Sequence, residues 1–161
     1  GCRTIGAAPA HPRPPMNTPS DFVSAWRRLA VKHRVGLGPL MGSRGDEFAV
    51  ALAAASLAVP PGVSLSEREV NDRLVAWLAG PGAMLATDHV ELRRWLVDLG
   101  FLERDGYGRE YRRVAPPVEF AAAVAALAAI DAGAVAEAAR VELARDRAER
   151  RARHEARGGA A

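Results

Sequence analysis

The sequence predicts a mainly α-helical protein with one small β-hairpin, and two observations lead to this class. Alanine, the strongest helix former, occupies 34 of the 161 positions, whereas aromatic residues make up only 6%. Over most of the chain after residue 18, apolar side chains recur every three or four residues, as in helices with one buried face. The exception lies at 101–114, where two short runs flank a turn that contains glycine. We therefore expect closely packed helices and a single hairpin.

Length, charge and composition narrow the class further. A chain of 161 residues fits one domain with arms. Apolar runs are too short for a membrane span and the start of the chain lacks an apolar export segment, so we expect a cytoplasmic protein without membrane contact. One cysteine and four scattered histidines show no ligand spacing, so we expect no metal and no cofactor. The net charge of +3 permits a nucleic-acid partner without requiring one.

The first 45 residues predict an arm, a helix and a linker. Residues 1–17 are rich in proline and have no helical or strand period, so we expect a disordered arm. Residues 18–45 predict a basic amphipathic helix, capped by Ser20 or Asp21, and then a glycine-rich linker. The basic side chains of this helix either contact phosphates or form the solvated back of a packed helix. They are Arg27, Arg28, Lys32 and Arg34.

Residues 46–115 predict three helices and then the hairpin. The first helix spans 47–58 and the second runs from a capping box at Ser66 to about Ala79. The third begins at Thr87 or Asp88 and ends before Gly100, and the hairpin follows at 101–114. The centre of the core is expected to contain the large apolar residues of the second and third helices, namely Trp77, Leu92, Trp95 and Leu96.

Residues 116–161 predict a long alanine-rich helix over 118–157, with a possible bend at Gly133 and a frayed end. Its apolar stripe is too hydrophobic to remain exposed on a helix with little else to pack on. We therefore expect a homodimer through this stripe, which consists of Phe120, Val124, Leu127 and Ile130.

Three helices followed by a two-stranded hairpin is the order of a winged helix-turn-helix, in which one helix enters the DNA major groove and the hairpin forms the wing. The expected recognition helix is 88–99. Arginine binds a guanine edge through two hydrogen bonds or neutralises a phosphate. The candidate DNA contacts are the basic residues of this helix and of the wing, namely His89, Arg93, Arg94, Arg109, Arg112 and Arg113.

Two features leave this assignment open. Arg94 and Asp98 stand four residues apart and could pair with each other, and Glu91 beside them would repel DNA. Along the wing, side chains alternate, so Arg109 and Arg113 share one face and Arg112 lies on the other. Only one face can meet DNA, and we favour Arg109 and Arg113.

The segments SLSEREVNDRL (64–74) and HVELRRWLVDLGFLERDGYGREYRRV (89–114) resemble the bacterial domain of unknown function 2087. The similarity covers about residues 64–114, roughly a third of the chain. Such domains occur alone or attached to ArsR-like transcriptional regulators, so the resemblance implies a role in DNA-linked regulation. The preceding helix is usually basic in that family, whereas DEFAVALAAASLA contains no basic residue.

These features favour a DNA-binding regulatory protein that acts on double-stranded DNA in the nucleoid. The alternative is a protein–protein interaction or dimerisation module without direct DNA binding. We do not expect an enzyme, because the conspicuous carboxylates and hydroxyls are capping or surface groups and no histidine is placed to activate a nucleophile.

Overall fold

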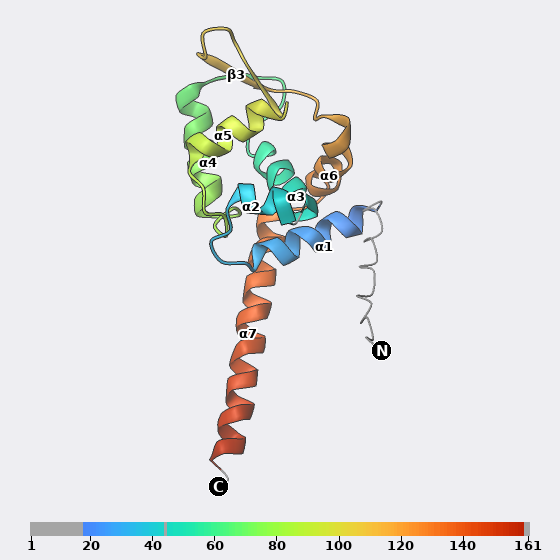
Figure 1. Ribbon diagram of the computed structural model, residues 1–161, viewed down its shortest axis with the longest axis vertical. Coiled ribbons are helices and arrows are strands. Elements are labelled where there is room, and N and C mark those ends of the chain that lie inside the picture. The colour runs from blue at the N-terminus through green and yellow to red at the C-terminus, as the bar shows by residue number, and fades with distance from the viewer. Residues whose placement is uncertain (1–17, 44, 160–161) are drawn as a thin grey trace, which may run out of the picture.

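The computed structural model describes residues 18–43 and 45–159 and is mostly helical (Figure 1), as predicted. In chain order, its elements are α1 (Pro19–Ala30), α2 (Leu37–Ser43), α3 (Gly45–Ser56), β1 (Ser64–Ser66), α4 (Glu67–Ala79), α5 (His89–Asp98), β2 (Leu102–Arg104), β3 (Glu110–Arg113), α6 (Val118–Ala128) and α7 (Ala132–Gly158). The expected arm at residues 1–17 lies outside the described residues.

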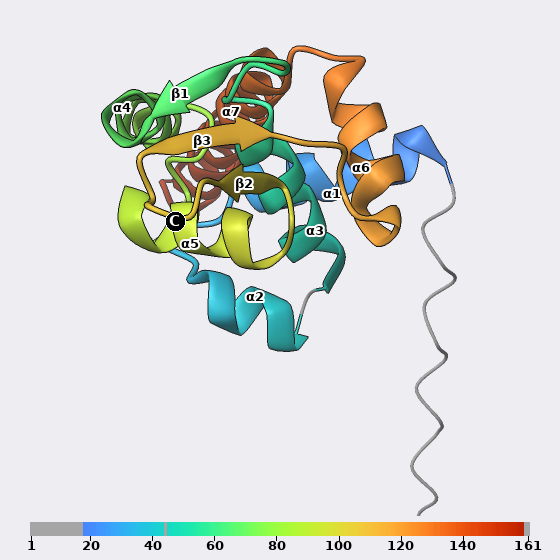
Figure 2. The ribbon, with the colours of Figure 1, turned by 90° about the horizontal axis from the view of Figure 1, so that it is seen from above.

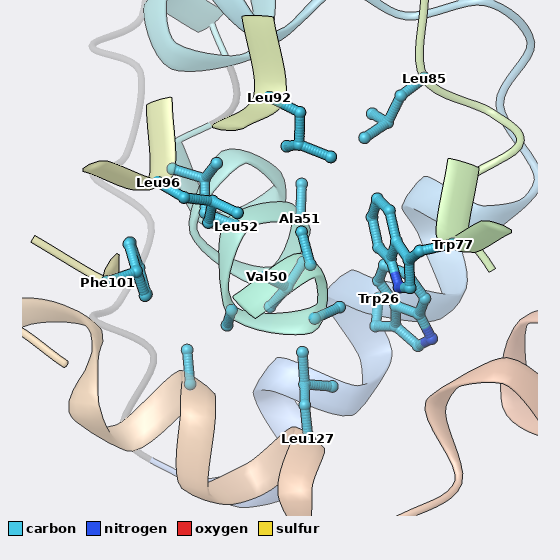
Figure 3. Packing of buried hydrophobic residues seen from close by; sticks show 14 of the residues in the cluster. Trp26, Val50, Ala51, Leu52, Trp77, Leu85, Leu92, Leu96, Phe101 and Leu127 are labelled. Carbon is cyan, nitrogen blue, oxygen red and sulfur yellow. The ribbon is translucent and has the colours of Figure 1, made fainter. Parts of the chain in front are cut away.

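Helix α3 is the centre of the fold. All of its residues from Val50 to Ser56 are buried, and four of these seven are alanine. Small side chains let α1 and α6 approach α3 closely, and the side chains of α5 close the core from another direction (Figure 3). The predicted helix at 47–58 therefore exists, slightly displaced, because packing on all sides stabilises it.

The sheet has three antiparallel strands in the order β1, β3, β2 (Figure 2). The predicted hairpin is confirmed as β2 and β3, whereas the sequence did not predict β1. Leu65 of β1 lies opposite Tyr111 of β3, and both side chains are buried. A three-residue strand directly before a helix cap carries too short a pattern to be recognised in isolation.

Several helix ends agree with the sequence. Ser66 Oγ accepts a hydrogen bond from Glu69 N at 3.2 Å, and Glu69 Oε2 accepts one from Ser66 N at 2.7 Å. These bonds lower the pKa of Glu69, the backbone bond from Ser66 most strongly. Asp88 caps α5, and Gly100 ends it with a φ of +84°. The cap of α1, however, is Thr18 rather than Ser20 or Asp21.

The expected glycine-rich linker is in part a helix, α2. Its two leucines, Leu37 and Leu40, are 1% and 2% exposed, and their burial offsets the poor helix propensity of the surrounding glycines. Just before it, Val35 N donates to Met84 O at 2.9 Å and Ala86 N donates to Val35 O at 2.8 Å. The segment is therefore attached to the α4–α5 loop and is not a free linker.

The expected single C-terminal helix is two helices, α6 and α7, bent by 73°. Asp131 caps α7 by accepting from Ala134 N at 3.0 Å, so the chain turns at this residue. In the described part of the chain, no helix by itself is long and apolar enough to span a membrane. Only α6 and α7 taken together reach that length and apolarity, across their bend.

The bend removes the reason for the expected dimer interface. It folds α6 back onto α1 and α3, so Leu127 is 1% exposed. Phe120, Val124 and Ile130 are partly buried against the same core, and the rings of Phe120 and Phe101 lie 4.9 Å apart. The premise that this stripe has little else to pack on is therefore wrong, because its own chain covers it.

The expected core centre is correct except for one tryptophan. Leu92 and Leu96 are fully buried and Trp77 is 8% exposed, but Trp95 is only partly buried and meets the edge of Phe48 at 5.4 Å. The fully buried tryptophan is Trp26, in ring contact with Trp77 at 6.4 Å. Trp26 is buried because α1 packs on α3. The apolar spacing along α5 alone did not indicate this contact between two other helices.

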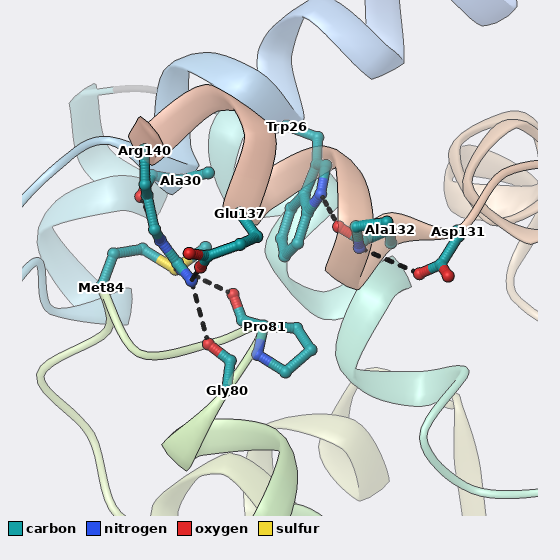
Figure 4. A network of polar contacts seen from close by, with 10 residues as sticks. Trp26, Ala30, Gly80, Pro81, Met84, Asp131, Ala132, Glu137 and Arg140 are labelled. Carbon is teal, nitrogen blue, oxygen red and sulfur yellow. Dashed lines mark hydrogen bonds and ion pairs between the residues drawn. The ribbon is translucent and has the colours of Figure 1, made fainter. Parts of the chain in front are cut away.

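The start of α7 is attached to the body by two side chains (Figure 4). Trp26 Nε1 donates to Ala132 O at 2.8 Å. Arg140 donates through Nε to Ala30 O at 3.0 Å, and through its two terminal nitrogens to Gly80 O at 3.2 Å and Pro81 O at 3.0 Å. We call this region, where α1, α3 and the start of α7 meet, the junction. Beyond it α7 projects from the body (Figure 1).

Candidate nucleic-acid interface

A groove of about 520 Å³ lies between α5 and the β2–β3 hairpin. We call it the α5/hairpin groove. Its walls combine arginine, acidic and aromatic side chains, and the residues that line it are Glu67, Arg93, Arg94, Val97, Asp98, Arg104, Tyr107, Gly108 and Tyr111. The predicted recognition helix and wing therefore face a common hollow, and the partners of each arginine decide what this hollow can bind.

Arg93 is a structural residue of the groove. Its guanidinium donates a hydrogen bond to Asn71 Oδ1, lies 3.2 Å from Glu67 Oε1, and stands 5.5 Å from the centre of the Tyr111 ring. Only 12% of its side chain is exposed. These contacts tie α5 to α4 and to the sheet, so the predicted contact from Arg93 to DNA would require breaking them.

Arg94 and Arg104 are the exposed arginines of the groove. Neither forms an ion pair with any described residue, and the alternative pairing of Arg94 with Asp98 is not formed. Arg104 was not among the DNA contacts predicted from the sequence. The register of the hairpin would have identified it. Arg104 lies directly opposite Tyr111, on the sheet face that is turned toward α5.

The tip of the hairpin presents an aromatic ring beside a guanidinium. Tyr107 is 85% exposed, and the Arg109 guanidinium lies 5.5 Å from its ring centre. The turn is held by Asp105, whose Oδ1 accepts from Arg109 N at 2.7 Å and from Glu110 N at 3.3 Å. The backbone hydrogen bond from Arg109 lowers the pKa of Asp105 below its ordinary value.

The two remaining arginines of the hairpin, Arg112 and Arg113, lie on opposite faces of the sheet. Arg113 donates to Val59 O at 2.8 Å and is partly buried, so it braces the chain before β1. The predicted contact from Arg113 to DNA would therefore require breaking this hydrogen bond. Arg112 is exposed on the outer face, directly across from Glu103.

The outward surface of α5 is acidic. At helical spacing, Arg94 lies between Glu91 and Asp98, and Asp88 precedes them at the cap. All four of these residues are exposed, whereas His89 in the first turn is partly buried. One arginine among three carboxylates is poorly suited to the negatively charged major groove, so phosphate contact is more compatible with this site than base readout.

Three of the four basic residues predicted for the first helix have acidic partners within the chain, whereas the fourth, Arg34, lies beyond the end of α1 and is exposed. Arg28 lies 2.9 Å from Asp46, Lys32 lies 2.9 Å from Glu47, and Glu47 is only 1% exposed. Arg27 pairs with Glu142 at 2.7 Å. Of the two interpretations of this helix, the packed one therefore agrees with the structure.

The fold and the groove define a small, mainly helical protein with exposed arginines beside a β-hairpin. Residues 43–113 match the model of the family described as an uncharacterized protein conserved in bacteria (DUF2087), which agrees with the resemblance seen in the sequence. The match begins before the motif segments and includes the whole of the buried helix α3. No curated protein and no solved structure matches the chain. Within the described residues, no three His, Cys, Asp or Glu side chains are grouped to hold a metal ion.

Proposed function

We propose that this protein binds duplex DNA through the α5/hairpin groove and acts as a DNA-binding regulatory protein. The observation that carries the proposal is the convergence of Arg94 and Arg104 on one groove, with guanidinium groups that no described acidic side chain neutralises. An arginine is always charged and offers up to five N–H donors, which suits it to phosphate oxygens.

The hairpin extends this surface. Arg109 and Tyr107 project at its tip, where a cation and an exposed ring reach the same neighbourhood. In a winged helix the hairpin tip reaches the DNA backbone beside the groove that the helix occupies. The order α3, α4, α5 and hairpin is consistent with that use, and the resemblance to domains found with ArsR-like regulators points in the same direction.

Phosphate contact is expected to dominate and base readout to contribute little. The acidic residues Glu91 and Asp98 flank Arg94 on the outward surface of α5, so inserting this helix deeply would bring carboxylates against the DNA. Affinity supplied by phosphates depends weakly on sequence and strongly on salt.

A protein-interaction module is the second candidate, and the same acidic surface favours it. Asp88, Glu91 and Asp98 would meet a basic partner protein more favourably than a nucleic acid. Under this alternative the protein does not bind duplex DNA at low salt.

Fluorescence anisotropy with a labelled duplex tests the proposal. The variant Arg94→Gln/Arg104→Gln should bind more weakly, and its plot of log affinity against log salt should be flatter by about two units, one for each lost phosphate contact. The matched control is Arg145→Gln/Arg153→Gln, which removes the same charge from two exposed positions of α7. A parent protein that binds no duplex, or equal slopes for both variants, would contradict the proposal.

A further inference from the structure

The distal part of α7 has no packing role within the described chain. Every residue from Arg147 to Gly158 is exposed, and the helix extends away from the body (Figure 1). Alanine, arginine and glutamate are good helix formers, and the docked first turns remove the cost of nucleation. The helix therefore presents all its sides to a potential ligand.

Charge is distributed unevenly around this helix. At 3.6 residues per turn, four arginines fall within about a third of its circumference. We call this sector, formed by Arg147, Arg150, Arg151 and Arg157, the basic face of α7. The acidic residues of the same segment point outside that sector. None of the four arginines forms an ion pair with a described residue.

The basic face continues into a pocket where α7 meets the body. This pocket, of about 380 Å³, includes His33, Arg140 and Arg147 in its lining, together with Lys32, which pairs with Glu47. No acidic side chain of the described residues lines it. Arg140 is held by three carbonyl groups and lies 3.9 Å from Glu137, so its charge is fixed in place at the head of the basic face.

We propose that the basic face of α7 is a second nucleic-acid-binding surface, which contacts the phosphates of a duplex. The face rises about 15 Å from Arg147 to Arg157, and B-DNA presents one negative charge per about 1.7 Å of its axis, so a linear polyanion matches it along its whole length. A single small anion would engage only the pocket.

A lipid surface fits this helix less well. Interfacial helices bury large apolar side chains opposite their basic face. Here the side away from the basic face carries Ala148, Ala152 and Ala156, which offer little area for insertion. Charge complementarity without a bulky apolar face therefore favours nucleic acid over an anionic membrane.

This surface is separate from the α5/hairpin groove. The hairpin and the distal end of α7 lie at opposite ends of the molecule's long axis (Figure 1). A short duplex in the groove would leave the basic face of α7 uncovered, so the two surfaces are expected to bind independently.

The experiment uses the full chain in the background of Arg94→Gln/Arg104→Gln, so that groove binding is already weakened. Residual duplex binding is expected, and adding Arg147→Gln/Arg151→Gln should flatten its salt dependence by about two further units. Adding Arg145→Gln/Arg153→Gln instead removes equal charge from outside the basic face and should leave the slope unchanged. Circular dichroism should show the same helicity for both, because glutamine retains helix propensity.

Several outcomes would overturn the inference. They are the absence of residual binding in the groove variant, equal effects of the two α7 variants, and saturation of the pocket by millimolar inorganic phosphate without any duplex binding. Equal binding by the parent and the groove variant would instead contradict the proposed function and leave α7 as the sole duplex surface.

Discussion

The junction and the α5/hairpin groove are both rich in basic residues. They differ in whether those side chains have partners within the protein. At the junction, Lys32 pairs with the buried Glu47, and Arg140 donates to three backbone carbonyls. In the groove, Arg94 and Arg104 have no acidic partner among the described residues. A basic residue therefore indicates a ligand site only where the fold leaves its charge unpaired.

The difference follows from burial. A carboxylate such as Glu47 cannot be buried without a compensating cation, so the junction must contain paired charges. The tip of the hairpin reaches beyond the core, so Arg104 and Arg109 remain hydrated without cost to folding. Substitutions at the junction should therefore lower stability, whereas substitutions in the groove should alter binding.

The largest expected effect on stability is at the junction. Trp26→Ala removes a fully buried ring and its hydrogen bond to Ala132, and should lower the free energy of unfolding by about 3 to 5 kcal/mol. Trp95→Ala, on α5, should cost less because that ring is only partly buried, where it meets Phe48 of α3. Urea unfolding measures both values. A larger loss of stability for Trp95→Ala than for Trp26→Ala would contradict the prediction that the junction contributes more to stability than the region around Trp95.

A smaller effect is expected from the arginines themselves. Arg140→Gln loses charged hydrogen bonds to carbonyls at a partly buried site, and should lower the free energy of unfolding by about 2 kcal/mol. Arg94→Gln should change it by less than about 0.5 kcal/mol, because the side chain is exposed and unpaired. Equal free energies of unfolding for the two variants would contradict the conclusion that Arg140 stabilises the fold and Arg94 does not.

The smallest effect concerns the hairpin tip and is visible only at low pH. Because folding lowers the pKa of Asp105, its contribution is present above the ordinary carboxyl pKa and is lost as pH falls through the lowered value. The amide resonances of Arg109 and Glu110 should shift together across that range. Asp105→Asn should abolish this titration, and an unchanged titration would assign it to another carboxylate.

Local signals predicted much of the fold. The capping box at Ser66, the cap at Asp88 and the turn at Gly100 depend on neighbouring residues, and all three are present. The helix α2 depends on contacts with distant segments, which no local pattern contains. The bend at Asp131 has a local signal, the cap to Ala134, and it lies two residues from the possible bend predicted at Gly133.

The candidate site was predictable only in part. Sequence spacing selected α5 and the hairpin and placed Arg94 outward with Arg93 at the flank, but it did not show that Arg93 is held by other elements. The partners of Arg93 are Asn71, Glu67 and Tyr111, which belong to other elements. Arg104 was missed because its position depends on strand register, and the hydrogen bond from Arg113 to Val59 O joins segments that no local pattern connects.

The proposed DNA contact is tested most directly by mapping amide resonances of the full chain as a short duplex is added. We expect the largest shifts at Arg94, Arg104 and the hairpin tip, and none along α1, whose basic side chains are paired. Shifts that cluster on α1, or no shifts at low salt, would contradict the account.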